Sequence, residues 1–191
     1  ENIKHIFDRF VEIGPSVQDG RWNRLCMAVS ELWDKGHSDK RIPPIVRKRF
    51  MDENCCQHHA TWILHKYDPE GSRDLFKKKA RKIFDEARKK PAGDDESFDP
   101  DNDLHNLLSF LDGDRTPFIL EGMDHPDKFV REESYYYWDS IPEKDARPRL
   151  LRGLEDQHPG VRGWAACAFT ESFGTREDVP LLEKRLAVET D

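Results

Sequence analysis

The segment CCQHH at residues 55–59 brings two thiols and two imidazoles within five positions, and both are donors that zinc prefers. On a helix Cys55 and His59 share one face, whereas His58 shares a face with Trp62. One turn of helix therefore supplies two ligands, and a tetrahedral site needs four. Because the sequence offers no clear source for the others, we expect two buried cysteines and two surface histidines rather than a metal site.

Three aspartates, at positions 99, 101 and 103, have the spacing of the first three ligands of an EF-hand loop. Leu104 stands where that loop needs its glycine, and Phe110 where it needs glutamate, so calcium binding is rejected. The sequence also contains no nucleotide-binding loop, nucleophile elbow or paired catalytic motif. It therefore predicts neither catalytic residues nor a cofactor.

The charge balance concerns the partner. The chain has a net charge of −7, and 36% of its residues are charged. Nucleic-acid binders usually carry a basic stripe, because neutralising phosphates supplies much of the affinity. The negative net charge therefore argues against a nucleic-acid partner and favours a basic protein partner. We interpret the basic run at residues 77–82 as a solvated helix face.

The cysteine pattern and hydropathy concern location. The four cysteines do not form a disulfide framework, since Cys55 and Cys56 are adjacent and cannot easily pair with each other. Reduced thiols are typical of the cytoplasm, which is the expected location. No apolar run approaches the roughly 20 residues of a membrane helix, so we expect no membrane association.

Apolar residues recur at helical spacing along almost the whole chain, which predicts an all-α fold. Gly36 marks the end of the second helix, and Ser72 is the expected N-cap of the fifth. Residues 91–103 hold six acidic residues and are expected to be a loop. The predicted helices cover residues 3–11, 22–33, 44–51, 54–67, 73–87, 104–111, 117–123, 129–140, 147–154, 161–173 and 179–187.

A repeat is visible when the prolines are used as a ruler. Pro117, Pro148 and Pro180 are 31 and 32 residues apart, and each is expected to open a helix. Six residues after each proline stands an apolar residue, which is Met123, Leu154 or Leu186. Val130-Arg131 follow Met123 by seven and eight residues, and Val161-Arg162 follow Leu154 by the same distances. A fixed period with internal landmarks is typical of stacked helical pairs, which bury a continuous apolar ribbon between neighbours.

The stretch PRLLRGLEDQHPGVRGWAACAFTESFGTREDVPLLEKRL, residues 148–186, resembles HEAT or HEAT-like repeats of the phycobilin-lyase type. The resemblance is good for residues 115–188, fair for 42–67 and weak elsewhere. It implies a single α-solenoid of stacked antiparallel helix pairs over residues 1–191. Within it, residues 1–90 would form divergent helical pairs, 91–103 the acidic loop and 104–191 the HEAT-like repeats.

In that family, the turn acid and the second-helix arginine often form a ladder along the stack. The matching positions are Asp124 with Arg131 and Asp156 with Arg162. Such a pair contributes at most ~1 kcal/mol when it is partly exposed. Ser134 replaces the first alanine of one repeat, so a bend is expected near it.

The second helices line the concave side in HEAT-like proteins, which implies a binding ridge. On a wheel of 3.6 residues with Val161, Ala165 and Ala168 inward, Gly163, Cys167 and Thr170 turn outward. Shifting this pattern by 31 residues gives Glu132, Tyr136 and Asp139, and the same pattern placed from Cys56 gives His58, Trp62 and His65. The predicted partner-binding residues are these six and Thr170.

Two classes of function follow. The first is a non-catalytic protein-binding scaffold, one subtype of which is an immunity or antitoxin-type protein that masks a basic toxin. The second is a HEAT-like enzyme of the lyase or DNA-glycosylase type. The charge balance favours the scaffold, because the glycosylases need a basic concave face.

Overall fold

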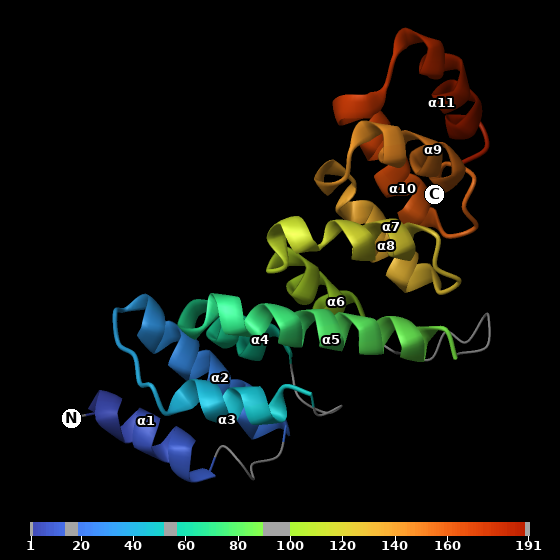
Figure 1. The fold of residues 1–191 in the computed structure, drawn as a ribbon. Coiled ribbons are helices and arrows are strands. Elements are labelled where there is room, and N and C mark those ends of the chain that lie inside the picture. Colours follow the sequence, from blue (N-terminus) through green and yellow to red (C-terminus); the bar gives the residue numbers. More distant parts are fainter. Residues whose placement is uncertain (1, 14–18, 52–56, 90–99, 190–191) are drawn as a thin grey trace. The chain divides into compact units, whose positions relative to one another are not determined.

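The computed structural model describes residues 2–13, 19–51, 57–89 and 100–189, and every regular element in these ranges is helical (Figure 1). The predicted all-α fold is therefore confirmed. The contacts divide the chain into two compact units. The N-terminal unit comprises Glu1–Lys82 with Asn102–Leu111, and the C-terminal unit comprises Ile83–Asp101 with Asp112–Asp191.

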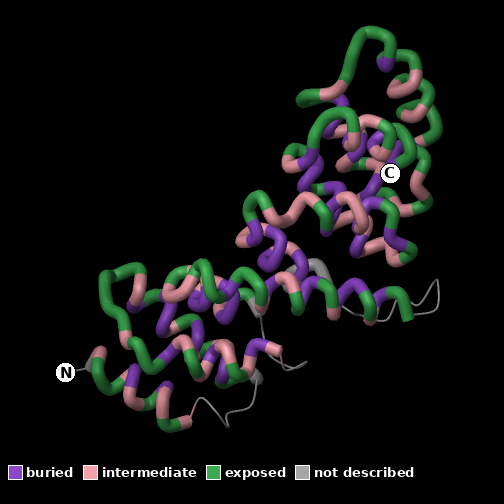
Figure 2. The backbone as a smooth tube through the Cα atoms, viewed as in Figure 1, coloured by how far each residue is buried: buried purple, intermediate pink, exposed green. Residues whose placement is uncertain are grey.

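The N-terminal unit buries large aromatic side chains among its helices. Phe10 packs on Trp22 with ring centroids 5.2 Å apart, and Phe50 packs on Phe76 at 5.4 Å. All four residues are fully buried. Figure 2 colours the buried residues of the chain purple. Its helices are α1 (Asn2–Ile13), α2 (Asp19–Asp34), α3 (Ile42–Arg49), α4 (Gln57–Tyr67), most of α5 (Pro69–Ala87) and α6 (Pro100–Ser109).

The predicted stop of α2 at Gly36 is confirmed. Gly36 has φ +84°, and its N–H donates to the Trp33 carbonyl at 2.8 Å while that of His37 donates to Leu32 at 2.9 Å. This pair of bonds is the Schellman arrangement, which requires the left-handed conformation that glycine adopts without strain.

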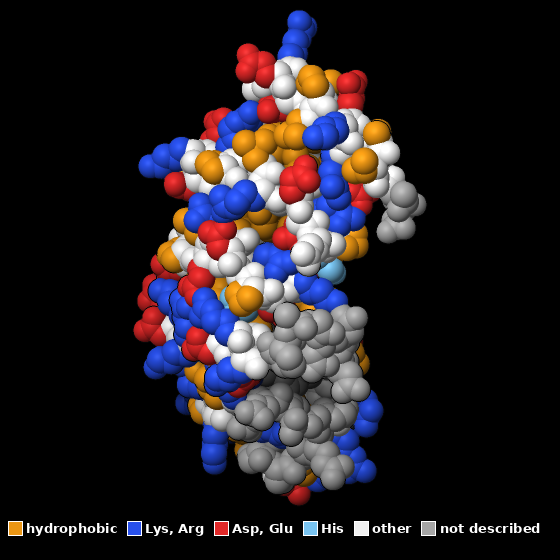
Figure 3. Space-filling view, turned by 90° about the vertical axis from the view of Figure 1, so that its right-hand side faces the viewer, with side chains coloured by type: hydrophobic (Ala, Val, Ile, Leu, Met, Phe, Trp, Pro, Cys, Tyr) orange, Lys and Arg blue, Asp and Glu red, His pale blue; other side chains and the backbone are white. Residues whose placement is uncertain are grey.

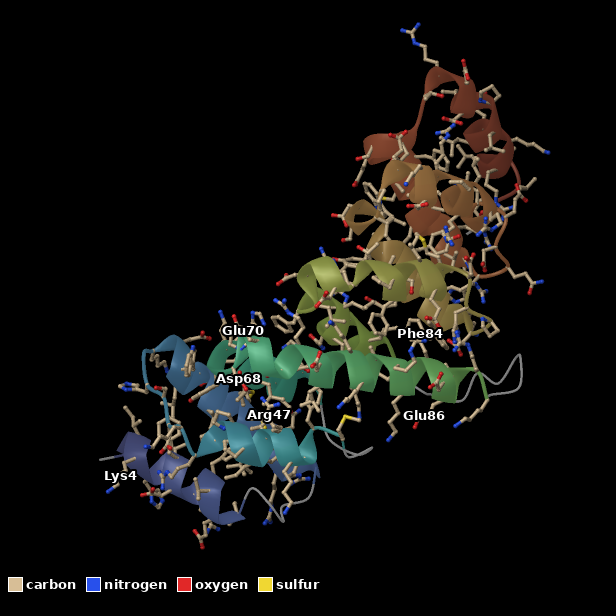
Figure 4. The ribbon with its side chains drawn as sticks, in the orientation of Figure 1. Lys4, Arg47, Asp68, Glu70, Phe84 and Glu86 are labelled. Atoms are coloured by element: carbon tan, nitrogen blue, oxygen red, sulfur yellow. The ribbon has the colours of Figure 1, made fainter. Side chains whose placement is uncertain are left out.

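Helix α5 begins three residues before the predicted N-cap, so the prediction for Ser72 was wrong. Asp68 takes that role, because its carboxylate accepts the Gly71 N–H at 3.0 Å. Arg47 of α3 donates to the Asp68 carboxylate and to the Gly71 carbonyl at 2.9 Å, which fixes this corner (Figure 4). Ser72 is instead buried inside the helix, and its hydroxyl donates to the Leu64 carbonyl at 3.0 Å.

Two other expectations in this part of the chain need correction. The basic run at residues 77–82 is not wholly solvated, because Lys79 is buried while Lys78 and Arg81 are exposed. The acidic loop predicted at 91–103 lies mostly outside the described residues, and its last positions belong to α6, which begins at Pro100.

The C-terminal unit consists of short helices that pack side by side. Helix α7 packs on α8, and α10 packs on both α8 and α9. The elements are α7 (Thr116–Met123), α8 (Lys128–Tyr136), a 3₁₀ turn (Trp138–Ser140), α9 (Glu143–Gly153), α10 (Pro159–Ala168), a π turn (Phe169–Phe173), a second 3₁₀ turn (Arg176–Asp178) and α11 (Val179–Leu186).

The proline ruler holds for two of its three marks. Pro117 and Pro180 lie in the first turns of α7 and α11, where a missing N–H costs little. Pro148 lies inside α9, which begins at Glu143, so the predicted start at residue 147 was wrong. Acidic residues in the first turn favour the earlier start, and the carbonyl that Pro148 leaves without its helical donor belongs to exposed Lys144.

Packing in this unit recurs with the 31-residue spacing of the sequence. A Cβ atom on Gly122 of α7 would collide with Ser134, and one on Gly153 of α9 would meet Ala165, 31 residues after Ser134, at 3.0 Å. Val130 and Val161 are likewise both fully buried. Ser134 fits the buried position because its hydroxyl donates to the Val130 carbonyl at 2.7 Å.

Candidate functional site

The predicted partner-binding residues are divided between the two units. His58, Trp62 and His65 lie on α4 in the N-terminal unit. Glu132 and Tyr136 lie on α8, Asp139 in the 3₁₀ turn that follows, and Thr170 in the π turn after α10, all in the C-terminal unit. Among the seven, His58, Tyr136, Asp139 and Thr170 are exposed, and the other three are half-buried.

Two of the three α4 residues contact α6 or the residue that follows it. His58 Nδ1 lies 2.8 Å from the Asn106 side-chain oxygen, and the His65 ring stacks on Phe110 with centroids 4.4 Å apart. Trp62 is half-buried beneath the Lys66 ammonium group, 5.6 Å from the ring centroid. The two histidines therefore have structural contacts within their own unit, which account for their types without a partner.

The C-terminal unit carries an aromatic pair in which the tyrosine is exposed and the tryptophan is half-buried. Tyr136 is 41% exposed, and its ring meets that of Trp164 from α10 edge-to-face at 4.8 Å. Tyr137 packs on Tyr136 at 4.9 Å and is covered by the Arg115 guanidinium, 5.2 Å from its centroid. We call Tyr136 and Trp164 the aromatic surface.

Trp164 was missed by the sequence reasoning. The helical wheel placed it beside the buried stripe, and the residue 31 positions earlier is Glu133, so the shift between repeats gave no aromatic counterpart. The position of Trp164 could have indicated it. Trp164 stands three residues after inward-facing Val161, at the edge of the buried stripe, where a large ring can reach the surface.

An arginine clasp joins α8 to the turn before α10. Arg131 donates to both carboxylate oxygens of Asp156 at 2.8 and 2.9 Å and to the carbonyls of His125 and Pro126 at 3.0 and 2.8 Å. Two donors of one planar guanidinium thus meet one carboxylate, which fixes both groups. Burial of the Asp156 carboxyl opposes ionisation, but the hydrogen bonds from Arg131 and the His158 N–H lower its pKa below the usual value.

The clasp recurs 31 residues later. Arg162 donates to the Glu189 carboxylate at 2.9 and 3.0 Å and to the carbonyls of Asp156 and Gln157 at 3.1 and 3.0 Å. The hydrogen bonds from Arg162 hold the pKa of Glu189 below its ordinary value. Each arginine therefore binds the acid of the following turn.

The pairs expected within one repeat, Asp124 with Arg131 and Asp156 with Arg162, were wrong as carboxylate pairs. The Asp124 carboxylate instead binds Arg149 at 3.0 Å and Arg152 at 2.5 Å, both from α9. The Arg131 side chain reaches the carboxylate of a later turn, that of Asp156, and binds only carbonyl groups in the turn before its own helix.

His-Pro occurs at residues 125–126 and 158–159, but the two histidines do not occupy equivalent positions in the structure. His158 is the N-cap residue of α10, a position that Asp127 occupies in α8. His125 instead matches Asp156, since each accepts the N–H of the N-cap residue two positions on, at 3.1 and 2.8 Å. His125 is buried and its Nε2 lies 3.2 Å from the Phe84 carbonyl, which assigns the proton to Nε2; burial lowers its pKa.

Further contacts join α8 to α9 and α10. Glu132 lies against His158, with 3.2 Å between Oε2 and Nδ1, and covers Gly160 closely. It therefore links α8 to α10 rather than pointing freely outward. Beneath it the Tyr135 hydroxyl donates to the Arg149 carbonyl at 2.7 Å, and burial raises the pKa of Tyr135 to about 12.

The described residues were searched for a metal site and for a membrane-spanning helix. Within those ranges no group of three or more His, Cys, Asp and Glu residues could hold a metal ion. Cys55 and Cys56 of the CCQHH segment lie outside them, so the expectation that they are structural stays a prediction. Of the helices described, none combines the length and the hydropathy that crossing a bilayer requires.

Comparison of the chain with protein-family models, with curated proteins and with solved structures found no match.

Proposed function

We propose that this chain is a non-catalytic protein-binding scaffold, in which short helix pairs stack as a HEAT-like α-solenoid and the second helices α8 and α10 carry the binding surface. The observation that supports this proposal most is the edge-to-face pair of Tyr136 and Trp164, which joins two neighbouring helices and remains accessible on one side.

The chemistry of this pair fits an interface. Tyr and Trp are enriched at binding hot spots, because a rigid ring buries much apolar area at small entropic cost while its polar atom still finds a partner. The Arg131–Asp156 clasp and the Glu132–His158 contact hold α8 against α10, so the rings would be ordered before a partner arrives. Preordering reduces the entropic cost of binding.

The partner that fits best is a basic protein. Asp139 in the 3₁₀ turn after α8 is exposed, and the chain as a whole carries a net charge of −7, which speeds association with a positively charged molecule. An immunity or antitoxin-type protein, which masks a basic toxin, has these properties and is the subtype we propose.

The test uses the full chain as bait in an extract of its native cell, with captured proteins identified by mass spectrometry and the main one then purified. Tyr136→Ala should weaken its binding about tenfold or more, the usual effect of losing a tyrosine hot spot. Leu151→Ala, an exposed apolar change on α9, is the matched control and should leave the affinity unchanged. A partner that binds the Tyr136→Ala chain as tightly as the wild type contradicts the proposal, as does tight binding of duplex DNA at moderate salt.

A further inference from the structure

Helix α11 has the apolar pattern of α7 and α9 but does not bury it. Six residues after the ruler prolines, Met123 is 3% exposed and Leu154 is 1% exposed, whereas Leu186 is 76% exposed. Two residues after those prolines, Ile119 and Leu150 are fully buried, whereas Leu182 is half-buried. The stripe that forms the core in two repeats is therefore open in the third.

This open stripe forms one wall of a groove. The groove lies between α10 and α11 and has a volume of about 470 Å³. Its apolar lining comes from Ala166 of α10, from Val179, Leu182 and Leu186 of α11, and from Leu154. Figure 3 shows hydrophobic side chains at the surface in the upper part of the view. A contiguous apolar surface of this kind marks an interaction site in a folded protein.

The preceding repeats show what covers such a stripe. There the first helix packs against a second helix whose buried residues are spaced i, i+4 and i+7 and are small in the middle, as Val161, Ala165 and Ala168 are in α10. The third repeat already has the clasp that precedes a second helix, because Arg162 binds Glu189 as Arg131 binds Asp156. The occupant that fits the groove is therefore an amphipathic helix with a narrow, small-residue stripe.

The charges at the groove give the sign of that helix. Arg162 and Arg185 line the groove but both bind Glu189, and Arg185 also lies 3.6 Å from Glu155. Glu183 lines the groove, is exposed, and has no ion pair within the described ranges. Its carboxylate favours a lysine or arginine on the facing side of the occupant.

We propose that the α10–α11 groove binds a basic amphipathic helix of a partner protein, with apolar residues at i, i+4 and i+7 and a cationic residue opposite Glu183. This is a helix-in-groove mode of recognition. It rests on the proposed function only in that both surfaces bind protein, because Leu186 and Glu183 are outside the aromatic surface.

The test measures the fluorescence anisotropy of a labelled 16-residue helical peptide with Val at position 1, Ala at positions 5 and 8, and lysines on its polar positions. The full chain should bind it saturably, and Leu186→Ser should weaken binding about tenfold or more through lost apolar burial. Val188→Ser is the matched control, since Val188 is 60% exposed but does not line the groove, and it should change the affinity less than about twofold. Both substitutions fall on exposed side chains, so circular dichroism should show unchanged folding.

A charge exchange tests the second half of the proposal. Glu183→Lys should weaken binding of the lysine peptide and strengthen binding of a matched peptide in which glutamate replaces lysine. The proposal is overturned if the wild-type chain does not bind the lysine peptide saturably, or if Leu186→Ser and Val188→Ser act alike. It is also overturned if light scattering shows a dimer that Leu186→Ser dissociates, because the groove would then hold a second copy. Tyr136→Ala should leave peptide binding unchanged, so failure of the groove and failure of the aromatic surface are distinguishable.

Discussion

Replacing Arg131 by methionine keeps most of the side-chain volume but removes the guanidinium that joins α8 to the turn before α10. Four hydrogen bonds disappear, two of them to the Asp156 carboxylate. The Arg131 and Asp156 side chains are only 18% and 14% exposed, so water replaces the lost contacts poorly. An exposed ion pair contributes about 1 kcal/mol at most, and breaking a fully buried one costs about 3–5 kcal/mol. This nearly buried pair lies between them, and we expect a loss of about 2 kcal/mol in the free energy of unfolding.

Equilibrium unfolding in urea, followed by far-ultraviolet circular dichroism, measures this loss. With a slope of roughly 2 kcal/mol per molar urea, the midpoint should fall by about 1 M. Arg152→Met is the control, because its partner Asp124 is exposed and Arg152 itself is 58% exposed, so the midpoint should move by less than half as much. Equal shifts for the two variants, or no coupling between Arg131→Met and Asp156→Asn in a double-mutant cycle, would refute the clasp as a stabilising contact.

Two other predictions concern packing and pH. Gly153→Val should lower stability by about 2–3 kcal/mol, because its Cβ would enter the space of the Tyr135 ring. Gly163→Val should cost far less, because nothing lies within 4 Å of a Cβ at that position. Thermal unfolding compares the two variants, and similar melting temperatures would contradict the close approach of Gly153 to Tyr135. Hydrogen bonds from Arg147 and Thr175 lower the pKa of Asp178 to about 2, so its contribution is complete above the unfolded value of about 3.9 and is lost as the pH falls through about 2. The melting temperature of Asp178→Asn should therefore be lower than wild type at pH 7 and fall less steeply between pH 4.5 and 2; parallel curves would contradict this.

Local chemistry determines which parts of the fold the sequence could predict. Apolar periodicity located the helices, and Gly36 and Pro117 marked ends correctly because each acts through its own backbone. The helix starts predicted from Ser72 and Pro148 were wrong, because the effect of these residues on a helix start depends on neighbouring residues. Asp68 was free to cap α5 earlier, and the acidic first turn of α9 allowed that helix to start before its proline.

The candidate site was less accessible to sequence reasoning. The helical wheel selected Thr170 directly and, shifted by 31 residues, Tyr136, and both are exposed. Applied to residues 54–67, the same wheel also selected His65, whose ring stacks on Phe110, 45 positions later in the chain. It missed Trp164, which has no aromatic counterpart in the preceding repeat. Such contacts depend on which residues meet across helices, and a period alone does not specify that.

The groove was missed for a related reason. Leu186 has the same place in the sequence pattern as Met123 and Leu154, and only its exposure reveals that its partner surface is absent from the described residues. Equal pattern does not imply equal burial, because burial depends on the element that packs next to the residue.

Site-specific photo-crosslinking tests the central claim most directly. The photoreactive amino acid p-benzoylphenylalanine replaces Tyr136 in one chain and exposed Leu151 of α9 in a second. After irradiation in the native cell extract, the chain carrying it at position 136 should form a covalent adduct with one basic protein, and the chain carrying it at position 151 should not. Equal labelling at both positions, or adducts at 151 alone, would contradict binding through the aromatic surface.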